Sequence, residues 1–420
     1  DGAVTLEGNY LRELAHPHAG RATFASSDPR LDAIFAAAGQ TFRQNATDIF
    51  MDCPSRERAG WLCDSFFTAR VEANLTGAMA VERNFLENYA QPAKFPGLVS
   101  GMLPMCYPMD PSKGRYIPNW AMWFVLQLEE YESRTGDREL VDQLRPKIEA
   151  LFDFFTRFEN SDGLLENLEE WVFVEWSKAN ELVQDVNYPS NMLYAAALDS
   201  ASKLFGREDW RVKADALRST INDQAFDGTF YRDHAVRLSD GELDIRPDRT
   251  EVCQYYAFFF RVATPDSRPK LWRTLVEEFG PHRRETKAHP AIHPCNQLPG
   301  NMLRIEILSR NGETANIYDE AIGYWHSMAM TTGTLWEHDQ ATASCNHGFA
   351  SHAAVVLHRD ILGIRSIDYQ EKSIVFSLPD NPLRHCRGSL PTPDGDIIVE
   401  WNRDGGDPQI ALPPGWRAQE

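Results

Sequence analysis

The richest group of chemically active side chains in the sequence lies between residues 52 and 64. Three carboxylic acids, two arginines and a tryptophan share this segment with a proline and a glycine that indicate a shaped loop: Asp52, Arg56, Glu57, Arg58, Trp61 and Asp64. A carboxylate beside an arginine stays ionised, whereas burial against an apolar ring raises the pKa of a carboxyl group. Acid–base hydrolysis needs one acid in each state. We therefore predict a catalytic loop; a solvated loop held by ion pairs is the alternative.

Two further clusters combine tryptophan with glutamate. Glu337 follows Trp336, and His347 comes soon afterwards at the expected start of a helix. This segment is interpreted as a second half of the site, although Trp336 could equally lie in the core and Glu337 could cap a helix. In the other cluster, Trp171 and Trp176 stand five residues apart with Glu175 between them, which suits a sugar ring or an ordinary core.

Hydrolysis of a glycosidic bond is the chemistry that uses such parts. It requires two carboxyl groups across the scissile bond, and aromatic and acidic side chains around the sugar ring. The separation of the two groups is ~5 Å in retaining enzymes and ~6.5–9.5 Å in inverting enzymes, a distance that no sequence supplies.

The elements that would position these clusters are mostly helices. Apolar residues recur with helical spacing from about Asp28 to Ile364. The stretches with the strongest helical pattern are Phe66–Ala90, Trp120–Arg134, Glu139–Phe158, Asn191–Leu204, Trp210–Gln224, Tyr255–Ala263, Lys270–Phe279, Met302–Ser309, Ala315–Ser327 and Ala350–Leu362. Their connectors pair a glycine with an acidic residue, which is typical of helical hairpins. An open solenoid and a closed toroid both fit, and the absence of a repeated consensus favours the toroid.

After Ile364 the pattern changes to alternating residues. Ser373–Leu378, Asp396–Trp401 and Gln409–Leu412 predict strands of a small C-terminal β domain that begins at about Asp368. Near the other end, Ala3–Tyr10 could be a strand without a partner nearby. The chain begins with Asp1 and has no signal-peptide pattern, so either a leader was removed or this is a piece of a longer protein, and this possible strand favours the second; cytoplasm and periplasm both stay open.

The composition excludes several functions. With 42 basic and 61 acidic residues the net charge is −19, which disfavours a nucleic-acid partner. No apolar stretch approaches the ~20 residues of a membrane span, so no membrane partner is expected. Seven scattered cysteines predict buried thiols. The oligomeric state stays open, with a homodimer as one option.

No metal and no cofactor are predicted. His289, His293 and Cys295 have a spacing that could bind zinc, but Pro290 and Pro294 force extended backbone between them, so we interpret this segment as a lid. A Cys53 nucleophile has no activating context, and there is no glycine-rich phosphate loop.

The loop from Asp52 to Asp64 resembles the signature of the α-L-rhamnosidases of glycoside hydrolase family 78, Asp-Cys-Pro-x-Arg-Asp-Glu-Arg-x-Gly-Trp-x-Gly-Asp. The segments Thr332–Glu337 and Asn346–His347 resemble that family's second catalytic stretch. The resemblance implies an (α/α)6 toroid over residues 26–366 and a small β-sandwich over residues 367–420. It also implies that residues 1–25 are a linker or the end of an upstream β domain.

The resemblance also implies roles. Glu57 matches the general acid and Glu337 the general base of an enzyme that inverts configuration. The residues expected to bind substrate are Asp52, Arg56, Trp61, Asp64, Trp171, Glu175, Trp176, Trp336 and His347. Two departures stand out: the loop lacks the Asp that precedes the acid, and Cys63 replaces a glycine whose backbone freedom a cysteine does not share.

The sequence thus predicts an inverting, exo-acting glycoside hydrolase that removes a terminal α-L-rhamnosyl or similar deoxy-sugar residue from a carbohydrate substrate. Two alternatives stay open within this fold: a polysaccharide lyase on a similar toroid, and a catalytically silent carbohydrate-binding toroid. A helical-repeat interaction protein is the remaining alternative, and it would place Glu57 far from Glu337.

Overall fold

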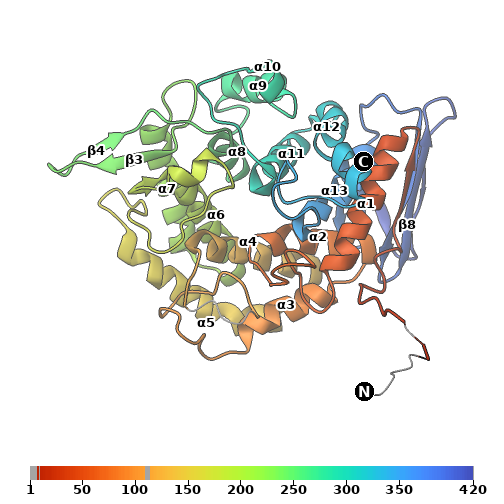
Figure 1. Ribbon diagram of the computed structural model, residues 1–420, viewed down its shortest axis with the longest axis horizontal. Coiled ribbons are helices and arrows are strands. Elements are labelled where there is room, and N and C mark those ends of the chain that lie inside the picture. The colour runs from red at the N-terminus through yellow and green to blue at the C-terminus, as the bar shows by residue number, and fades with distance from the viewer. Residues whose placement is uncertain (1–6, 9, 109–113, 420) are drawn as a thin grey trace, which may run out of the picture.

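The computed structural model describes residues 7–8, 10–108 and 114–419, and this part of the chain is mainly helical (Figure 1). Helices fill most of residues 29–362, and strands follow from residue 364 onward. The helices alternate between two kinds of burial. α1 (Pro29–Asn45), α3 (Ala80–Ala90), α5 (Arg138–Phe155), α7 (Glu208–Ala225), α9 (Pro269–Glu278) and α12 (Thr314–Thr332) bury one face.

The helices between them are buried on nearly every side: α2 (Asp64–Thr76), α4 (Pro118–Thr135), α6 (Tyr188–Phe205), α8 (Glu251–Phe259) and α11 (Met302–Arg310). Each packs on the next, from α2 through α4, α6 and α8 to α11. The short helix η4 (Gly348–His352) packs against α2, and His352 is hydrogen-bonded to Glu306 of α11. The packing contacts therefore run from α2 through the other buried helices and η4 back to α2. The helices that expose a face lie around these buried helices.

Two helical predictions need correction. The stretch Phe66–Ala90 is two helices, because Gly77 ends α2 in the left-handed region with φ of 67°. A Cβ at Gly77 would lie 2.5 Å from the carbonyl oxygen of Pro391, so only glycine allows the C-terminal sheet to approach here. The stretch Ala350–Leu362 is irregular: a π-turn, η5 (Leu357–Leu362), follows η4 and α13 (Ala353–Val356).

The C-terminal strands form two sheets. One has the order β1-β7-β8-β9, and the other β10-β6-β5. Their bounds are β1 (Thr23–Ser26), β5 (Ile364–Asp368), β6 (Ser373–Phe376), β7 (His385–Thr392), β8 (Gly395–Asn402), β9 (Gln409–Ala411) and β10 (Arg417–Gln419). β7 was not predicted because Gly388 and Pro391 interrupt its pattern.

At the N-terminal side, β1 pairs antiparallel with β7, so a segment that precedes the helices joins the C-terminal sheet. The strand predicted at Ala3–Tyr10 lies largely outside the described residues, and Glu7, Gly8 and Tyr10 have no regular structure.

The loops between the helices hold the remaining short elements. An unpredicted three-stranded sheet is formed by β2 (Val186–Asn187), β3 (His234–Arg237) and β4 (Leu243–Ile245). The short helices are η1 (Thr156–Phe158), η2 (Lys178–Glu181), α10 (Arg283–Thr286) and the π-turn η3 (Gln297–Asn301). Among the described helices, none combines the length and the apolar character needed to cross a membrane.

Candidate active site

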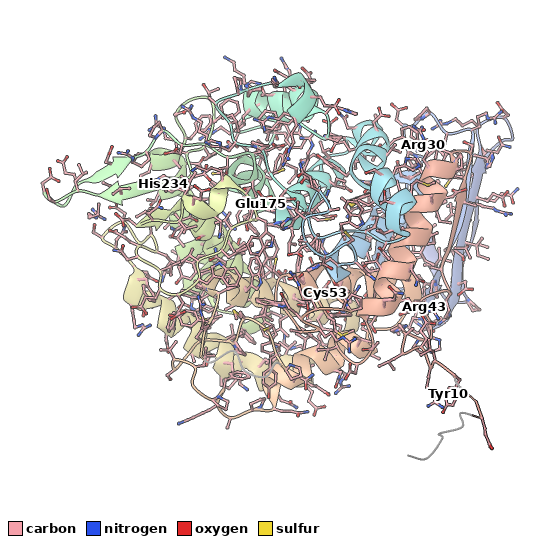
Figure 2. The ribbon with its side chains drawn as sticks, in the orientation of Figure 1. Tyr10, Arg30, Arg43, Cys53, Glu175 and His234 are labelled. Atoms are coloured by element: carbon pink, nitrogen blue, oxygen red, sulfur yellow. The ribbon has the colours of Figure 1, made fainter. Side chains whose placement is uncertain are left out.

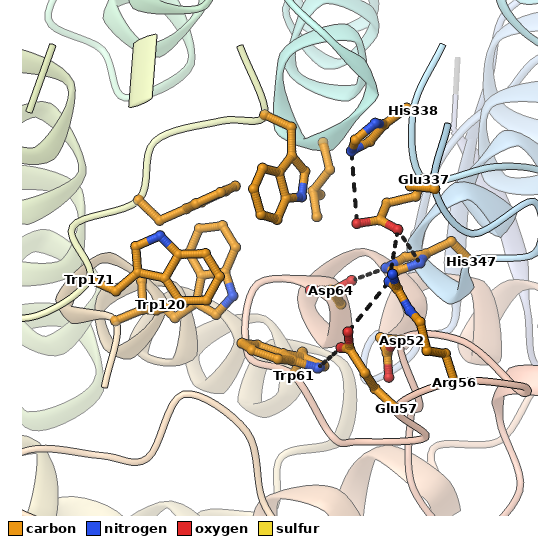
Figure 3. A pocket seen from close by; sticks show the side chains of 15 residues that line it. Asp52, Arg56, Glu57, Trp61, Asp64, Trp120, Trp171, Glu337, His338 and His347 are labelled. Carbon is orange, nitrogen blue, oxygen red and sulfur yellow. Dashed lines mark hydrogen bonds and ion pairs between the residues drawn. The ribbon is translucent and has the colours of Figure 1, made fainter. Parts of the chain in front are cut away.

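A cavity of about 340 Å³ opens where loops meet the N-terminal ends of α2, α4 and η4 (Figure 3). Nine of the eleven predicted site residues line it: Asp52, Arg56, Glu57, Trp61, Asp64, Trp171, Trp176, Glu337 and His347. Six further residues complete the wall: Ile117, Trp120, Phe173, Leu298, His338 and Ala343. Acidic groups and histidines occupy one side of the cavity and tryptophans the other.

Asp52 shapes the loop that carries Arg56 and Glu57. Its Oδ1 accepts a hydrogen bond from the backbone N–H of Ala59 at 2.9 Å, and its own N–H donates to the Ala59 carbonyl at 3.1 Å. These bonds close the loop at its base. Its other oxygen, Oδ2, is buried without a hydrogen-bond partner among the described residues, so it can accept from a ligand in the cavity.

Glu57 lies between a tryptophan and an arginine. Its Oε2 accepts a hydrogen bond from Trp61 Nε1 at 2.9 Å, and its Oε1 is 3.4 Å from Arg56 Nη2. Burial, together with the charge of Asp52, raises the pKa of Glu57, and Arg56 opposes this shift. A carboxyl group with a raised pKa suits proton donation near neutral pH.

Glu337 faces Glu57 across Arg56. Its Oε2 is 3.5 Å from the same Nη2 atom of Arg56, and it accepts a hydrogen bond from the backbone N–H of Ser344 at 3.2 Å. Nδ1 of His347 is 3.6 Å from that oxygen. The side chain of Glu337 is 8% exposed, so little water shields it from its neighbours.

His347 joins Glu337 to the start of α2. Its Nε2 is 2.9 Å from Oδ1 of Asp64, the first residue of that helix. Burial lowers the pKa of His347, but the bond to Asp64 and the nearby Glu337 outweigh burial and raise it overall. Nδ1 of His347 has no hydrogen-bond partner among the described residues, so it can contact a ligand or a water molecule.

The aromatic wall is continuous. The rings of Trp61 and Trp171 lie 6.3 Å apart, and Trp171 is 5.9 Å from Trp176. Phe173 fills the space behind them, at 4.8 Å from Trp176 and 4.7 Å from Trp120. This wall of aromatic rings lies on one side of the cavity and the hydrogen-bonding groups lie on the other. Such a cavity binds a molecule that has one apolar and one polar side.

Two predicted residues, Glu175 and Trp336, do not line the cavity. Glu175 is buried among the helices (Figure 2), and its Oε1 accepts hydrogen bonds from the backbone N–H groups of Asn296 and Gly300 at 2.9 and 3.0 Å. Burial raises the pKa of Glu175 to about 8. Trp336 is also buried and donates from Nε1 to Thr332 Oγ1 at 2.8 Å, which agrees with the core alternative.

Glu175 acts on the site through Asn296. The Asn296 side chain donates to the carbonyl of Trp176 and accepts from the backbone N–H of Asp339, each at 2.9 Å. One side chain thus connects the aromatic wall to the segment that follows Glu337, and the carboxyl of Glu175 holds the turn that carries it.

Sequence reasoning missed Trp120, Phe173, Leu298 and His338. Two of them stood beside predicted site residues: Phe173 lies between Trp171 and Glu175, and His338 follows Glu337. Trp120 was placed at the start of a helix without a role, and Leu298 lies in a π-turn with no sequence signature.

At Cys63 the structure shows why a glycine is usual at this position of the family signature. Cys63 precedes α2 with φ of 48°, a backbone conformation that favours glycine.

The residues of the zinc alternative do not converge: His289 pairs with Glu278 at 2.9 Å, and Cys295 donates to Asn301 at 3.0 Å. Within the described residues, no group of three or more His, Cys, Asp or Glu side chains could hold a metal ion.

Comparison with known proteins shows the family of the chain. Residues 19–361 match the family model described as the bacterial alpha-L-rhamnosidase 6 hairpin glycosidase domain. The chain belongs to this family. An α-L-rhamnosidase of Alteromonas sp. (strain LOR) is 22% identical over 424 residues, which cover 93% of this chain and 43% of the relative.

Solved structures agree in fold with this member of the six-hairpin glycosidases. The family 78 rhamnosidase of Bacillus sp. GL1 has a TM-score of 0.84 at 21% identity and covers 96% of this chain and 43% of its own. A Klebsiella oxytoca rhamnosidase with rhamnose bound has a TM-score of 0.66 at 19% identity, covering 80% and 64%. The chain therefore spans less than half the length of the first two relatives.

Proposed function

We propose that this chain is an inverting, exo-acting α-L-rhamnosidase in which Glu57 is the general acid and Glu337 the general base. The contact of both carboxylates with one guanidinium nitrogen carries the proposal. Since Arg56 Nη2 is 3.4 Å from Glu57 Oε1 and 3.5 Å from Glu337 Oε2, these two oxygens are at most about 7 Å apart, so both acids can reach one glycosidic bond; inversion is proposed from the family resemblance. Residues 280 positions apart in the chain thus share one cavity.

The surroundings of each acid support its role. Glu57, whose pKa is raised, would give its proton to the glycosidic oxygen as the bond to the anomeric carbon breaks. Glu337 would take a proton from the water that attacks the opposite face of that carbon. Asp52, Asp64 and His347 would hold hydroxyl groups of the sugar, and the tryptophan wall would face its methyl group, the apolar part of a 6-deoxy sugar.

The alternation of buried and half-exposed helices supports an (α/α)6 toroid over residues 26–366 in this proposal. In the same proposal the two C-terminal sheets would pack as a small β-sandwich over residues 367–420, and the pairing of β1 with β7 supports adding β1 to it. In such a toroid the N-terminal ends of the inner helices meet at one mouth, where the candidate site lies.

Kinetics of Glu57→Gln and Glu337→Gln test these roles. Each variant is expected to fold normally and to lose turnover of an α-L-rhamnoside by a factor of about 100 to 10,000. Glu57→Gln should be impaired most for poor leaving groups, because a good leaving group needs no proton, whereas Glu337→Gln should be impaired equally for both. Nuclear magnetic resonance should detect β-L-rhamnose as the first product. Normal turnover in either variant would remove the role assigned to it.

The same assay separates the two alternatives. A lyase would release an unsaturated product that absorbs ultraviolet light, and a silent module would bind rhamnose without turnover. A lyase substrate is a polyanion, but the described residues that line the cavity include four carboxylates and one arginine. This charge favours a neutral sugar.

A further inference from the structure

A second cavity lies behind η3, the turn that borders one side of the candidate active site. It has a volume of about 250 Å³ and shares no lining residue with the candidate active site. Residues of the turn line different cavities: Leu298 lines the candidate active site, whereas Gln297 and Asn301 line the second cavity. Tyr324 and Ser327 of α12 also line it. We call this second cavity the η3 cavity.

Polar groups without partners gather in the η3 cavity. Gln297 is 1% exposed, yet among the described residues neither its Oε1 nor its Nε2 has a hydrogen-bond partner. The buried hydroxyl of Tyr324 has none there either. Asn301 accepts a hydrogen bond from Cys295 at 3.0 Å through Oδ1, and its Nδ2 group can donate to a ligand. An unpaired buried donor or acceptor costs about 1–3 kcal/mol, so this cluster points to a ligand that pairs with it.

The fold of η3 does not require the side chain of Gln297. Glu175 holds the turn, since its Oε1 accepts from the backbone N–H groups of Asn296 and Gly300 at 2.9 and 3.0 Å. The Oδ1 atom of Asn296 accepts from the backbone N–H of Gln297 at 2.8 Å. The amide of Gln297 takes part in none of these bonds, so it is available to a ligand.

The charged side chains around the η3 cavity are paired with one another or exposed to water. Arg283 pairs with Glu251 at 2.7 Å, and Arg284 pairs with Asp339 at 2.8 Å. Glu285 is the remaining charged residue among the described residues that line the cavity, and its side chain is 80% exposed. A charged ligand would lose its hydration without gaining a free opposite charge, which costs free energy. The cavity therefore favours a neutral ligand.

The unpartnered groups match the hydroxyl groups of a ligand. An amide oxygen accepts, an amide nitrogen donates and a tyrosine hydroxyl does both. Burial, together with the charge of Glu320, raises the pKa of Tyr324 well above its usual range, so its hydroxyl stays protonated. Among the described residues that line the η3 cavity there is no tryptophan, whereas four line the candidate active site. Hydrogen bonds without a tryptophan wall favour hydroxyl groups on an open chain over a sugar ring.

We propose that the η3 cavity is a second binding site, separate from the candidate active site, and that it takes a small neutral acyclic polyol. Gln297, Asn301 and Tyr324 pair with the hydroxyl groups of this ligand. The inference goes beyond the proposed function and does not depend on it, because binding in the η3 cavity needs no turnover.

Three probes of equal chain length test the class of ligand. Erythritol is a neutral polyol, succinate is a dianion and putrescine is a dication. Saturation-transfer difference nuclear magnetic resonance titrations on the full chain measure the affinity of each. Erythritol should bind with a Kd of about 10 mM or below, and the two charged probes at least about tenfold more weakly. No saturable binding of erythritol up to about 100 mM would overturn the proposal, as would equally tight binding of either charged probe.

Three variants locate the bound erythritol. Gln297→Leu and Tyr324→Phe remove unpartnered groups at nearly constant volume, so both should fold. Ser327 is exposed on α12, and Ser327→Trp narrows the cavity that it lines. The matched controls are Gln40→Leu in α1 and Thr331→Trp, about one helical turn after Ser327, because neither residue lines the η3 cavity.

Gln297→Leu and Ser327→Trp should each weaken erythritol binding about tenfold or more, and Tyr324→Phe about threefold to fivefold. Both controls should bind erythritol as the wild type does. Wild-type affinity in Gln297→Leu and in Ser327→Trp would place erythritol elsewhere on the protein and overturn the proposal. Turnover of rhamnosides does not enter these measurements, so their outcome is independent of the proposed function.

Discussion

Two groups of acids lie within the helical part of the protein and differ in how they are paired. In the candidate active site, Asp52, Glu57, Asp64 and Glu337 share Arg56 and His347, and one Asp52 oxygen has no hydrogen-bond partner among the described residues. The second group is an ion-pair network: Glu306 contacts Arg70 at 2.9 Å and Arg359 and His352 at 2.8 Å, and Glu130, Arg134 and Asp360 extend it.

The pKa directions follow the pairing. Burial opposes ionisation of Glu306, but Arg359 and Arg70 outweigh burial and hold its pKa well below the usual range. In the candidate site, burial dominates and raises the pKa of Glu57 and of Asp64. Between these two groups, the acid of the ion-pair network is held ionised by its arginines, whereas the acids proposed to do chemistry are underpaired.

Removing an acid from the ion-pair network is expected to have the largest effect on stability. Glu306→Ala removes the carboxylate that Arg70 and Arg359 share. Glu130 and Asp360 still pair with these arginines, so the free energy of unfolding should fall by about 3 kcal/mol, the low end of the cost of breaking a buried ion pair. Urea denaturation followed by fluorescence measures this, and the protein that remains folded should keep the wild-type kcat.

The matched control is Glu277→Ala, which removes an exposed carboxylate from α9 and should change stability by less than about 0.5 kcal/mol. Glu57→Gln completes the contrast, because it should abolish turnover without loss of stability. A Glu306→Ala variant as stable as Glu277→Ala would remove the distinction between the two groups of acids.

The sequence predicted one group of acids and missed the other for a physical reason. Asp52, Glu57 and Asp64 fall in one short loop beside Trp61, so local spacing alone indicated a site. Arg70, Glu130 and Glu306 come from three different helices, and no pairing was predicted for them. Their pairing depends on which helix faces inward, and helical spacing does not supply that when a helix is buried on nearly every side, as α2 and α11 are.

The pH dependence of stability at Glu175 tests the contrast between paired and underpaired acids. Because its folded pKa of about 8 lies above the ordinary carboxyl value, it contributes stability that is complete at low pH and lost as the pH rises to about 8. Glu175→Gln keeps an acceptor for Asn296 and Gly300 and cannot ionise. Thermal unfolding between about pH 5 and about pH 9 should show the variant gaining on the wild type as the pH rises.

Other buried acids titrate identically in both proteins, so the difference between the two curves isolates Glu175. Glu175→Ala is the control: it leaves two backbone N–H groups without an acceptor and should be less stable at every pH, by about 1–3 kcal/mol per group. Parallel curves for the wild type and Glu175→Gln would show that this carboxyl is ionised throughout.

The segment 171–176 shows why the site was predictable only in part. Trp171 and Trp176 were expected at the sugar and line the cavity, but Glu175 points into the protein. The backbone before the segment is irregular, with φ of 64° at Glu170, so alternation does not determine which neighbour faces the cavity.

Helical hairpins were predictable because their spacing and turns are local, whereas β1 and β7 pair across more than 350 residues.

The smallest expected effect concerns Cys63, whose strained backbone immediately precedes Asp64. Cys63→Ala and Cys63→Gly both remove the buried thiol, and only glycine adopts φ of 48° without strain. The glycine variant should therefore be more stable than the alanine variant by about 1 kcal/mol in urea denaturation. At Ala69, in the middle of α2, the order should reverse, because glycine destabilises a regular helix by about 1 kcal/mol relative to alanine. Alanine more stable than glycine at both positions would show that the turn which presents Asp64 to His347 carries no strain.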